Sequence, residues 1–466
     1  MRQSRRFDFS MLGTVFTLAW PTMLEQFMQT AVQYIDTAMV GSLGTQATAA
    51  VGSTGTVSWL IGSVVSAIGV GFLAFIAQSL GAGKEENARR ASAQACTVAV
   101  LLGLALTALI QLFADRVPAW MQADPRIRDL AGRYFRILYL PMLFRTFSIL
   151  FGTLLRAAGD TRTPMRIGVA MNLINVVLNY LLIYPSREVT VAQLAFTMPG
   201  AGLGVEGAAW ASAAAFTAGG IAMAVTLWRH REISPRGQAF RPDRQILLPC
   251  FRVAFPNMLQ RFATSFGYVV FASMINALGE VSSAAHTVAN TVESAFYIPG
   301  WGMQTAAAAL SGRAWGAKDH DRFRQLGSTI LPLEITLMLV SGTLLFVLAE
   351  PLVRLFSREE EVIRLGVTVL RMVAVSEPFY GIPIVIEGLM QGVGKTTAPF
   401  LYNVAGMWGV RILGTWICTC LLGLGLVSAW GCMIGHNMLL FILFLIHYLT
   451  GRWDPWRYPD RLRSLS

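Results

Sequence analysis

The sequence predicts an all-α integral membrane protein, with twelve transmembrane helices in two pseudo-symmetric six-helix lobes around a central cleft. Three observations predict it: an apolar composition, about twelve long apolar segments, and a repeat that relates the two halves of the chain. The 466 residues are 54% hydrophobic and only 14% charged, whereas soluble proteins carry roughly a quarter charged residues. This composition excludes a soluble enzyme, a disordered chain and a nucleic-acid-binding protein.

Each apolar segment is long enough to cross the hydrocarbon core, which takes about 20 residues of α-helix. The first segment follows a basic stretch that ends at Phe9. It is too long for a signal peptide and lacks a small-residue cleavage site, so we expect it to stay in place as a helix. The predicted spans cover residues 11–35, 47–74, 92–113, 130–152, 165–184, 203–228, 246–274, 282–310, 327–348, 363–388, 399–420 and 425–449.

The longest polar break lies between the sixth and seventh spans and divides the chain into two lobes. We expect an N-terminal lobe (1–228), a cytoplasmic linker (229–245), a C-terminal lobe (246–450) and a cytoplasmic tail (451–466). Arginine and lysine gather in both tails, in the linker and in alternate loops, which lie on one side if the spans alternate in direction. Positive loops stay in the cytoplasm, so both termini are expected there. The net charge of +11 therefore indicates orientation in the cell inner (plasma) membrane.

Short motifs of the first half recur in the second half at a constant shift of 235 residues. Pro21 corresponds to Pro256, Gly81 to Gly316, and Gly159 to Gly394. A repeat at one fixed shift indicates duplication. Because six spans is an even number, the two lobes share one orientation and are related by an axis along the membrane normal. Two parallel bundles around a cleft are typical of a transporter rather than a channel or an enzyme.

Polar side chains inside the first and fifth spans form two stripes. Polar groups in hydrocarbon are costly, so such stripes face protein or a wet cavity. The first span carries Gln29, Gln33 and Asp36 on one helical face, with Glu25 beside it. The fifth span carries three asparagines on one face: Asn172, Asn175 and Asn179.

The two stripes could meet around one small cation or proton, because Asp36 and Asn179 both lie near the outer ends of their helices. Carboxylate and amide oxygens suit Na⁺, so Asp36, Asn175 and Asn179 are the predicted metal ligands if sodium is the coupling ion. A carboxyl group held away from water also binds a proton more readily. The alternative for these residues is plain interhelical hydrogen bonding.

The second half carries further polar side chains within its spans. Span eight contains His286 and Glu293, and span ten contains Tyr380 and Glu387. We expect these four, together with Glu25, Gln29 and Gln33, to line the substrate cleft or to form a secondary polar network. Two alternatives are open: the acids pair with intramembrane arginines in a structural network, and His286 is a packing residue. The arginines are Arg145, Arg261 and Arg411.

Two prolines begin matching helices of the two halves and are predicted hinges. Pro21 and Pro256 each remove a helix hydrogen bond and can bend the helix. Static kinks that serve packing are the alternative. The sequence shows no nucleotide-binding loop, no paired-histidine metal motif and no nucleophile arrangement. We therefore expect no enzymatic activity, no cofactor, and an ion gradient of H⁺ or Na⁺ as the driving force.

Several short motifs follow one another along nearly the whole chain. They include Tyr34-Ile-Asp-Thr-Ala-Met-Val-Gly41, Ala158-Gly-Asp-Thr-Arg-Thr-Pro164, Asn172 through Asn179, and Gly204-Val-Glu-Gly-Ala-Ala209. With the 235-residue repeat, this set resembles the multidrug and toxic compound extrusion transporters. The resemblance implies a twelve-helix fold of two six-helix lobes. It also implies export of organic cations or similar amphiphiles in exchange for H⁺ or Na⁺.

The resemblance also suggests which residues bind the coupling ion. It maps the acid of the first helix onto Asp36, two fifth-helix polar positions onto Asn175 and Asn179, and a sixth-helix hydroxyl onto Ser212. The sequence departs from the family in two places. An asparagine, Asn179, stands where some archaeal members have an aspartate, and the seventh helix has no acid. The choice between Na⁺ and H⁺ therefore stays open.

These observations together predict a secondary active antiporter that exports amphiphilic or cationic organic compounds, such as drugs and toxins. The alternative is a lipid or lipid-linked oligosaccharide flippase of the same superfamily, in which the three intramembrane arginines would serve a pyrophosphate headgroup. The expected partners are a small organic substrate and membrane lipid. We expect no nucleic acid partner, and we expect the protein to act as a monomer.

Overall fold

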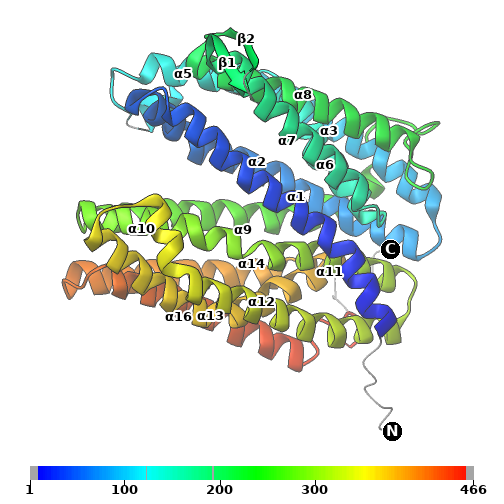
Figure 1. Ribbon diagram of the computed structural model, residues 1–466. Helices are drawn as coiled ribbons and strands as arrows, with labels where there is room; N and C mark the ends of the chain where they lie inside the picture. Colours follow the sequence, from blue (N-terminus) through cyan, green and yellow to red (C-terminus); the bar gives the residue numbers. More distant parts are fainter. Residues whose placement is uncertain (1–8, 122, 192–193, 458–466) are drawn as a thin grey trace. The chain divides into compact units, whose positions relative to one another are not determined.

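The computed structural model describes residues 9–121, 123–191 and 194–457. Most of this chain is α-helical (Figure 1). The helices are α1 (Phe9–Gly41), α2 (Thr45–Gly81), α3 (Glu85–Phe113), α4 (Val117–Trp120), α5 (Arg128–Leu138), α6 (Met142–Ala157), α7 (Arg162–Ile183), α8 (Gly204–Arg229), α9 (Arg244–Asn276), α10 (Glu280–Phe296), α11 (Ile298–Gly316), α12 (His320–Phe356), α13 (Glu360–Gly392), α14 (Thr397–Val404), α15 (Leu413–Trp416) and α16 (Leu426–Leu449). Two π-helical segments, η1 (Ala405–Ile412) and η2 (Ile417–Leu421), flank α15.

Eight helices of the described chain are long and apolar enough to cross a membrane. A ninth is added if α5 and α6, which meet at 54°, form one broken span. The break falls at Pro141, which has no N–H to donate within a helix. The two helices α1 and α9 have 33 residues each, which is ample length, but their glutamine and arginine side chains reduce their apolar character. The membrane-protein class is thus established, whereas the number of twelve spans stays a prediction.

A short β-hairpin departs from the predicted all-α fold. Its strands, β1 (Pro185–Val191) and β2 (Leu194–Ala201), pair antiparallel in the connection between α7 and α8 (Figure 1). The sequence of β1 contains Val189-Thr-Val191, and β-branched residues favour strands. The apolar segments on both sides dominated the sequence pattern, so this hairpin was not predicted.

The chain divides into two compact units. One contains Leu24–Phe72 and Glu85–Leu247, and the other contains the described residues up to Met23, Leu73–Lys84 and those from Leu248 onward. Both α1 and α2 therefore contribute to each unit. We call them the Asp36 unit and the C-terminal unit. The lobe boundaries expected from the sequence, 1–228 and 246–450, stay a prediction.

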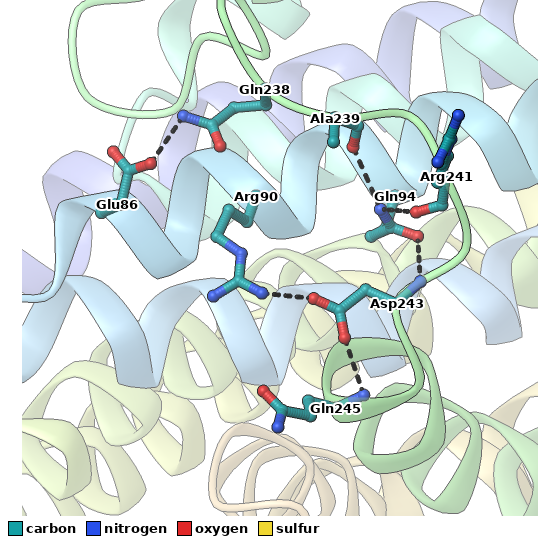
Figure 2. A network of polar contacts seen from close by, with 8 residues as sticks. All are labelled: Glu86, Arg90, Gln94, Gln238, Ala239, Arg241, Asp243 and Gln245. Atoms are coloured by element: carbon teal, nitrogen blue, oxygen red, sulfur yellow. Dashed lines mark hydrogen bonds and ion pairs between the residues drawn. The ribbon is translucent and has the colours of Figure 1, made fainter.

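The linker between α8 and α9 is bound tightly to α3 within the Asp36 unit, as Figure 2 shows. The buried side chain of Gln94 donates to the carbonyl oxygens of Ala239 (3.3 Å) and Arg241 (2.8 Å), and its oxygen accepts from the N–H of Asp243 (3.0 Å). The carboxylate of Asp243 also pairs with Arg90. Because unpaired buried backbone groups are costly, these bonds fix the path of the linker.

The described part of the tail packs on the first turns of α12 in the C-terminal unit. Trp453 stacks on Phe323, and the buried carboxylate of Asp454 lies 3.0 Å from Nε2 of His320 and 3.3 Å from Nε of Arg324. Burial by itself would raise the pKa of Asp454. The hydrogen bonds from His320, the Trp456 N–H and Arg324 outweigh that effect and hold the pKa below its ordinary value of 3.8.

Replacing Asp454 by Asn is expected to destabilise the protein at neutral pH by about 1–3 kcal/mol. A carboxyl group with a lowered folded-state pKa stabilises the fold above its unfolded pKa, and the stabilisation is lost as pH falls through the folded value. The difference in free energy of unfolding between Asp454→Asn and the unaltered protein should therefore shrink toward zero on acidification below pH 3.8. Thermal unfolding in detergent across this range measures it, with the exposed Glu361→Gln as control. A difference in stability between the two proteins that does not change with pH would contradict the prediction.

Candidate functional site

A cluster of polar side chains connects α1 to α7 and α8 in the Asp36 unit. The carboxylate of Asp36 accepts a hydrogen bond from Nδ2 of Asn179 at 2.5 Å. The amide of Asn175 satisfies more partners when its nitrogen faces Asp36, where it lies 3.0 Å from each carboxylate oxygen. In that orientation its oxygen accepts from the hydroxyl of Ser212 at 3.0 Å. The structure thus brings together four of the residues that the sequence predicted to bind the coupling ion.

Local helix geometry explains this meeting. Asn172, Asn175 and Asn179 are spaced so that they share one face of α7, and all three are buried. Ser212 lies on α8, which packs along α7 (Figure 1). Asn172 is one turn farther from Asp36 than Asn175. In the described chain its side chain has no hydrogen bond to the carboxylate, so it lies outside the immediate cluster.

The cluster can hold a proton or a small hard cation. Asp36 is only half-buried, and no ion pair among the described residues involves it. Its neighbour Asn179 has a buried Oδ1 that finds no hydrogen-bond partner in the described part of the chain. A carboxylate beside an unused amide oxygen offers the oxygen ligands that hard cations prefer. A proton on Asp36 would satisfy the same carboxylate.

The predicted cleft residues of α1 lie in two different environments. Gln29 and Gln33 are exposed. Glu25 instead forms an ion pair of 2.5 Å with Arg156 of α6, with both side chains largely buried. The glycine at 168 on α7 leaves room for this pair, because a Cβ there would come within 3.1 Å of the Glu25 side chain. Glu25 is therefore occupied by a structural contact.

The predicted polar residues of the second half lie in the C-terminal unit, where the two acids find local hydrogen-bond donors. Glu387 accepts hydrogen bonds from Gln260, Gln391 and Asn403. Glu293 accepts from the hydroxyl of Tyr297, whose ring contacts that of Tyr380. The ring of His286 packs edge-on against Phe271 and Trp430, at 5.7 and 5.9 Å between centroids.

Two of the three intramembrane arginines contact aromatic rings, although pairing with these acids was the alternative considered for them. Arg411 lies over the rings of Tyr268 and Phe271, at 4.7 and 4.2 Å. Arg145 lies over Tyr139 and Phe216. An aromatic face attracts a cation without a second charge having to be desolvated. The third, Arg261, donates to Asn257 at 3.1 Å.

One buried acid was missed by the sequence reasoning. Glu334 of α12 is fully buried beside Glu377 of α13, and the carboxylates of both lack hydrogen-bond partners among the described residues. The available signal was its position inside the apolar segment 327–348, where an ionisable residue indicates function.

In the described chain, no group of three histidine, cysteine or acidic side chains is placed to hold a metal ion.

The two predicted hinge prolines both lie inside unbroken helices. Pro21 is in α1, and Pro256 is in α9. Pro21 is two residues from Met23, the last residue of its segment in the C-terminal unit. A hinge role for either proline stays a prediction.

The fold and the cluster define a multi-pass helical membrane protein with a half-buried acid, Asp36, on its first helix. The family model named MatE matches residues 21–181 and again 256–417. The chain therefore belongs to the MatE family, which confirms the resemblance drawn from its motifs. The two matches begin 235 residues apart, the same shift as the internal repeat.

The chain is similar over nearly its whole length to relatives and solved structures. A Thermotoga maritima protein named probable multidrug resistance protein NorM is 27% identical over 441 residues, which cover 94% of this chain and 92% of the relative. A Bacillus subtilis protein named probable multidrug resistance protein YoeA is 24% identical, with 92% and 90% covered. A MOP superfamily transporter from Pyrococcus furiosus has the same fold, with TM-score 0.87, 23% identity, and 95% and 96% covered. A Vibrio cholerae MATE transporter has TM-score 0.85 at 19% identity, with 96% and 98% covered.

Proposed function

We propose that the protein is a secondary active multidrug efflux transporter that exports amphiphilic, mostly cationic organic compounds in exchange for H⁺ or Na⁺. One observation carries the proposal. The carboxylate of Asp36, on a helix of a MatE-family membrane protein, lies among the amides of Asn175 and Asn179 with no cationic partner among the described residues. Such a group can alternate between a bound ion and none, which a purely structural acid cannot.

The proposed architecture is twelve spans in two six-helix lobes around a central cleft, in the inner membrane, with both termini cytoplasmic. The relatives named above support the substrate class, because they are named multidrug resistance proteins. The flippase alternative is not favoured. Two of the arginines that would serve a pyrophosphate group, Arg145 and Arg411, are already engaged with aromatic rings. We further propose that the transporter works as a monomer, with no cofactor besides the coupling ion.

The test is dye efflux from proteoliposomes in which a proton or a sodium gradient is imposed separately. Ethidium is a suitable probe because it is an amphiphilic organic cation. We expect one of the two gradients to drive accumulation or release of the dye above the level of protein-free liposomes. The antiport proposal would be contradicted if neither gradient drove dye movement. It would also be contradicted if the dye moved equally well without any gradient.

A further inference from the structure

A cavity of about 430 Å³ lies in the Asp36 unit between α3, α6, α8 and the linker. Its wall is made mainly of apolar side chains, including Val100, Leu101, Phe147, Phe151 and Trp228. Cavities of about 300–1,000 Å³ accommodate ligands of substantial size. Leu101 is 62% exposed and Trp228 is 42% exposed, so the cavity opens onto the apolar surface of α3.

The linker builds one wall of this cavity. The hydroxyl of Thr97 donates to the carbonyl oxygen of Phe240 at 2.9 Å, and Gln94 holds the residues on either side (Figure 2). The ring of Phe240 then stacks on that of Trp228, with 6.2 Å between centroids and 5° between planes. The cavity is thus a fixed feature of the fold and lies outside the Asp36 cluster.

The cavity reaches the basic C-terminal end of α8. It takes residues from the last two turns of α8 and from the middle of α3. Arg229 directly follows Trp228, and Arg241 directly follows Phe240. Both arginines are exposed, and neither has an ion pair among the described residues. Positive charge at a membrane surface attracts the anionic lipids of the cytoplasmic leaflet.

We propose that the cavity binds one acyl chain of an anionic phospholipid, whose phosphate group is held by Arg229 and Arg241. The chemistry favours this occupant over the organic cations that the transporter is proposed to export. The polar side chains of the wall are the hydroxyl of Thr97 and the thiol of Cys96, so the wall holds no acid to pair with a cation. The adjacent arginines repel a cation and attract a phosphate.

The proposal is tested with a phosphatidylglycerol that carries a photoactivatable diazirine in its acyl chain. The full-length protein is reconstituted in vesicles of phosphatidylcholine that contain a small fraction of this probe. After illumination, the labelled peptides are mapped by mass spectrometry. We expect labelling concentrated on peptides that contain Val100, Leu101 and Phe151. The same diazirine in phosphatidylcholine should label these peptides several-fold less.

Two variants and a matched control sharpen the test. Ala224→Trp places a large ring in the cavity and should reduce labelling several-fold. Leu109→Trp puts the same ring on an exposed position of α3 outside the cavity and should not. If Ala224→Trp fails to fold by size-exclusion chromatography, Val100→Trp takes its place. The double variant Arg229→Gln with Arg241→Gln should abolish the preference for phosphatidylglycerol.

Three results would overturn the proposal. One is uniform labelling along α3, including the region of Leu109. Another is equal labelling by the two lipid probes in the unaltered protein, which would remove the role of the arginines. The third is loss of labelling on addition of ethidium, which would assign the cavity to the organic cation. Because these readouts need no transport, they stand or fall separately from the proposed efflux activity.

Discussion

Replacing Asp36 by Asn is expected to reduce ion-driven efflux to the level of protein-free liposomes while the protein still folds and reaches the membrane. The amide has nearly the shape of the carboxyl group and can keep the contact with Asn179 that the carboxylate makes at 2.5 Å. It can neither take up a proton nor neutralise a cation, so the exchange loses its ion. The measurement is dye efflux under the gradient that drives the unaltered protein, with the amount of protein in the membrane checked by immunoblot.

The control for this variant is Asp129→Asn, which changes the same functional group at an exposed position of α5 and should retain normal efflux. Measurements of ion binding and dye binding to Asp36→Asn test the same role. Thermodynamic linkage is reciprocal. If the ion lowers the affinity of the unaltered protein for the dye, the dye must lower the affinity for the ion by the same factor. Both effects should disappear together in the variant. Normal efflux by Asp36→Asn would refute the proposed role of this carboxyl group.

The sequence predicted the helices and the Asp36 cluster because both depend on local patterns. A run of about 20 apolar residues has few alternatives to a spanning helix. The asparagines on α7 follow helical spacing, as do Gln29, Gln33 and Asp36 on α1. Polar groups within apolar helices favour contact with one another over contact with hydrocarbon. The structure places Asn179 and Asp36 in contact although they are 143 residues apart in the chain.

The contacts that could not be predicted depend on how each helix is rotated. The pairing of Glu25 with Arg156 joins residues 131 apart, and no local pattern distinguishes it from the expected placement of Glu25 in the cleft. Arg145 and Arg411 lie on aromatic rings instead of acids, and no local sequence pattern indicates which ring faces the packing of the helices brings to them. The hairpin of β1 and β2 depends on a connection whose pattern is weak beside its apolar flanks.

The 235-residue repeat has a direct structural consequence in the C-terminal unit. Gly81 ends α2 and Gly316 ends α11, and the two glycines are repeat partners. A Cβ at Gly81 would lie 2.0 Å from the carbonyl oxygen of Arg313, and one at Gly316 would lie 1.9 Å from that of Gln78. Gln78 and Arg313 are also repeat partners. The two helix ends therefore contact each other reciprocally, as a local two-fold relation requires.

Replacing either glycine by alanine is expected to destabilise the protein by about 3 kcal/mol or more, because a backbone carbonyl in contact with the added methyl group cannot turn away as a side chain can. Because the contact is symmetric, Gly81→Ala and Gly316→Ala should have similar effects. The double variant should lose clearly less stability than the sum of the two single losses, since the first methyl group already forces the helices apart. Thermal unfolding of the purified protein in detergent gives all three values.

The matched control is Gly62→Ala on the same helix α2, where a Cβ would have no atom within 4 Å. Alanine in an open helical position is more stable than glycine by roughly 0.5–1 kcal/mol, so this variant should be neutral or slightly stabilised. Strictly additive losses in the double variant would contradict a shared contact. Losses of very different size for Gly81→Ala and Gly316→Ala would contradict its symmetry, and with it the view that the duplication is expressed in the packing of these two helix ends.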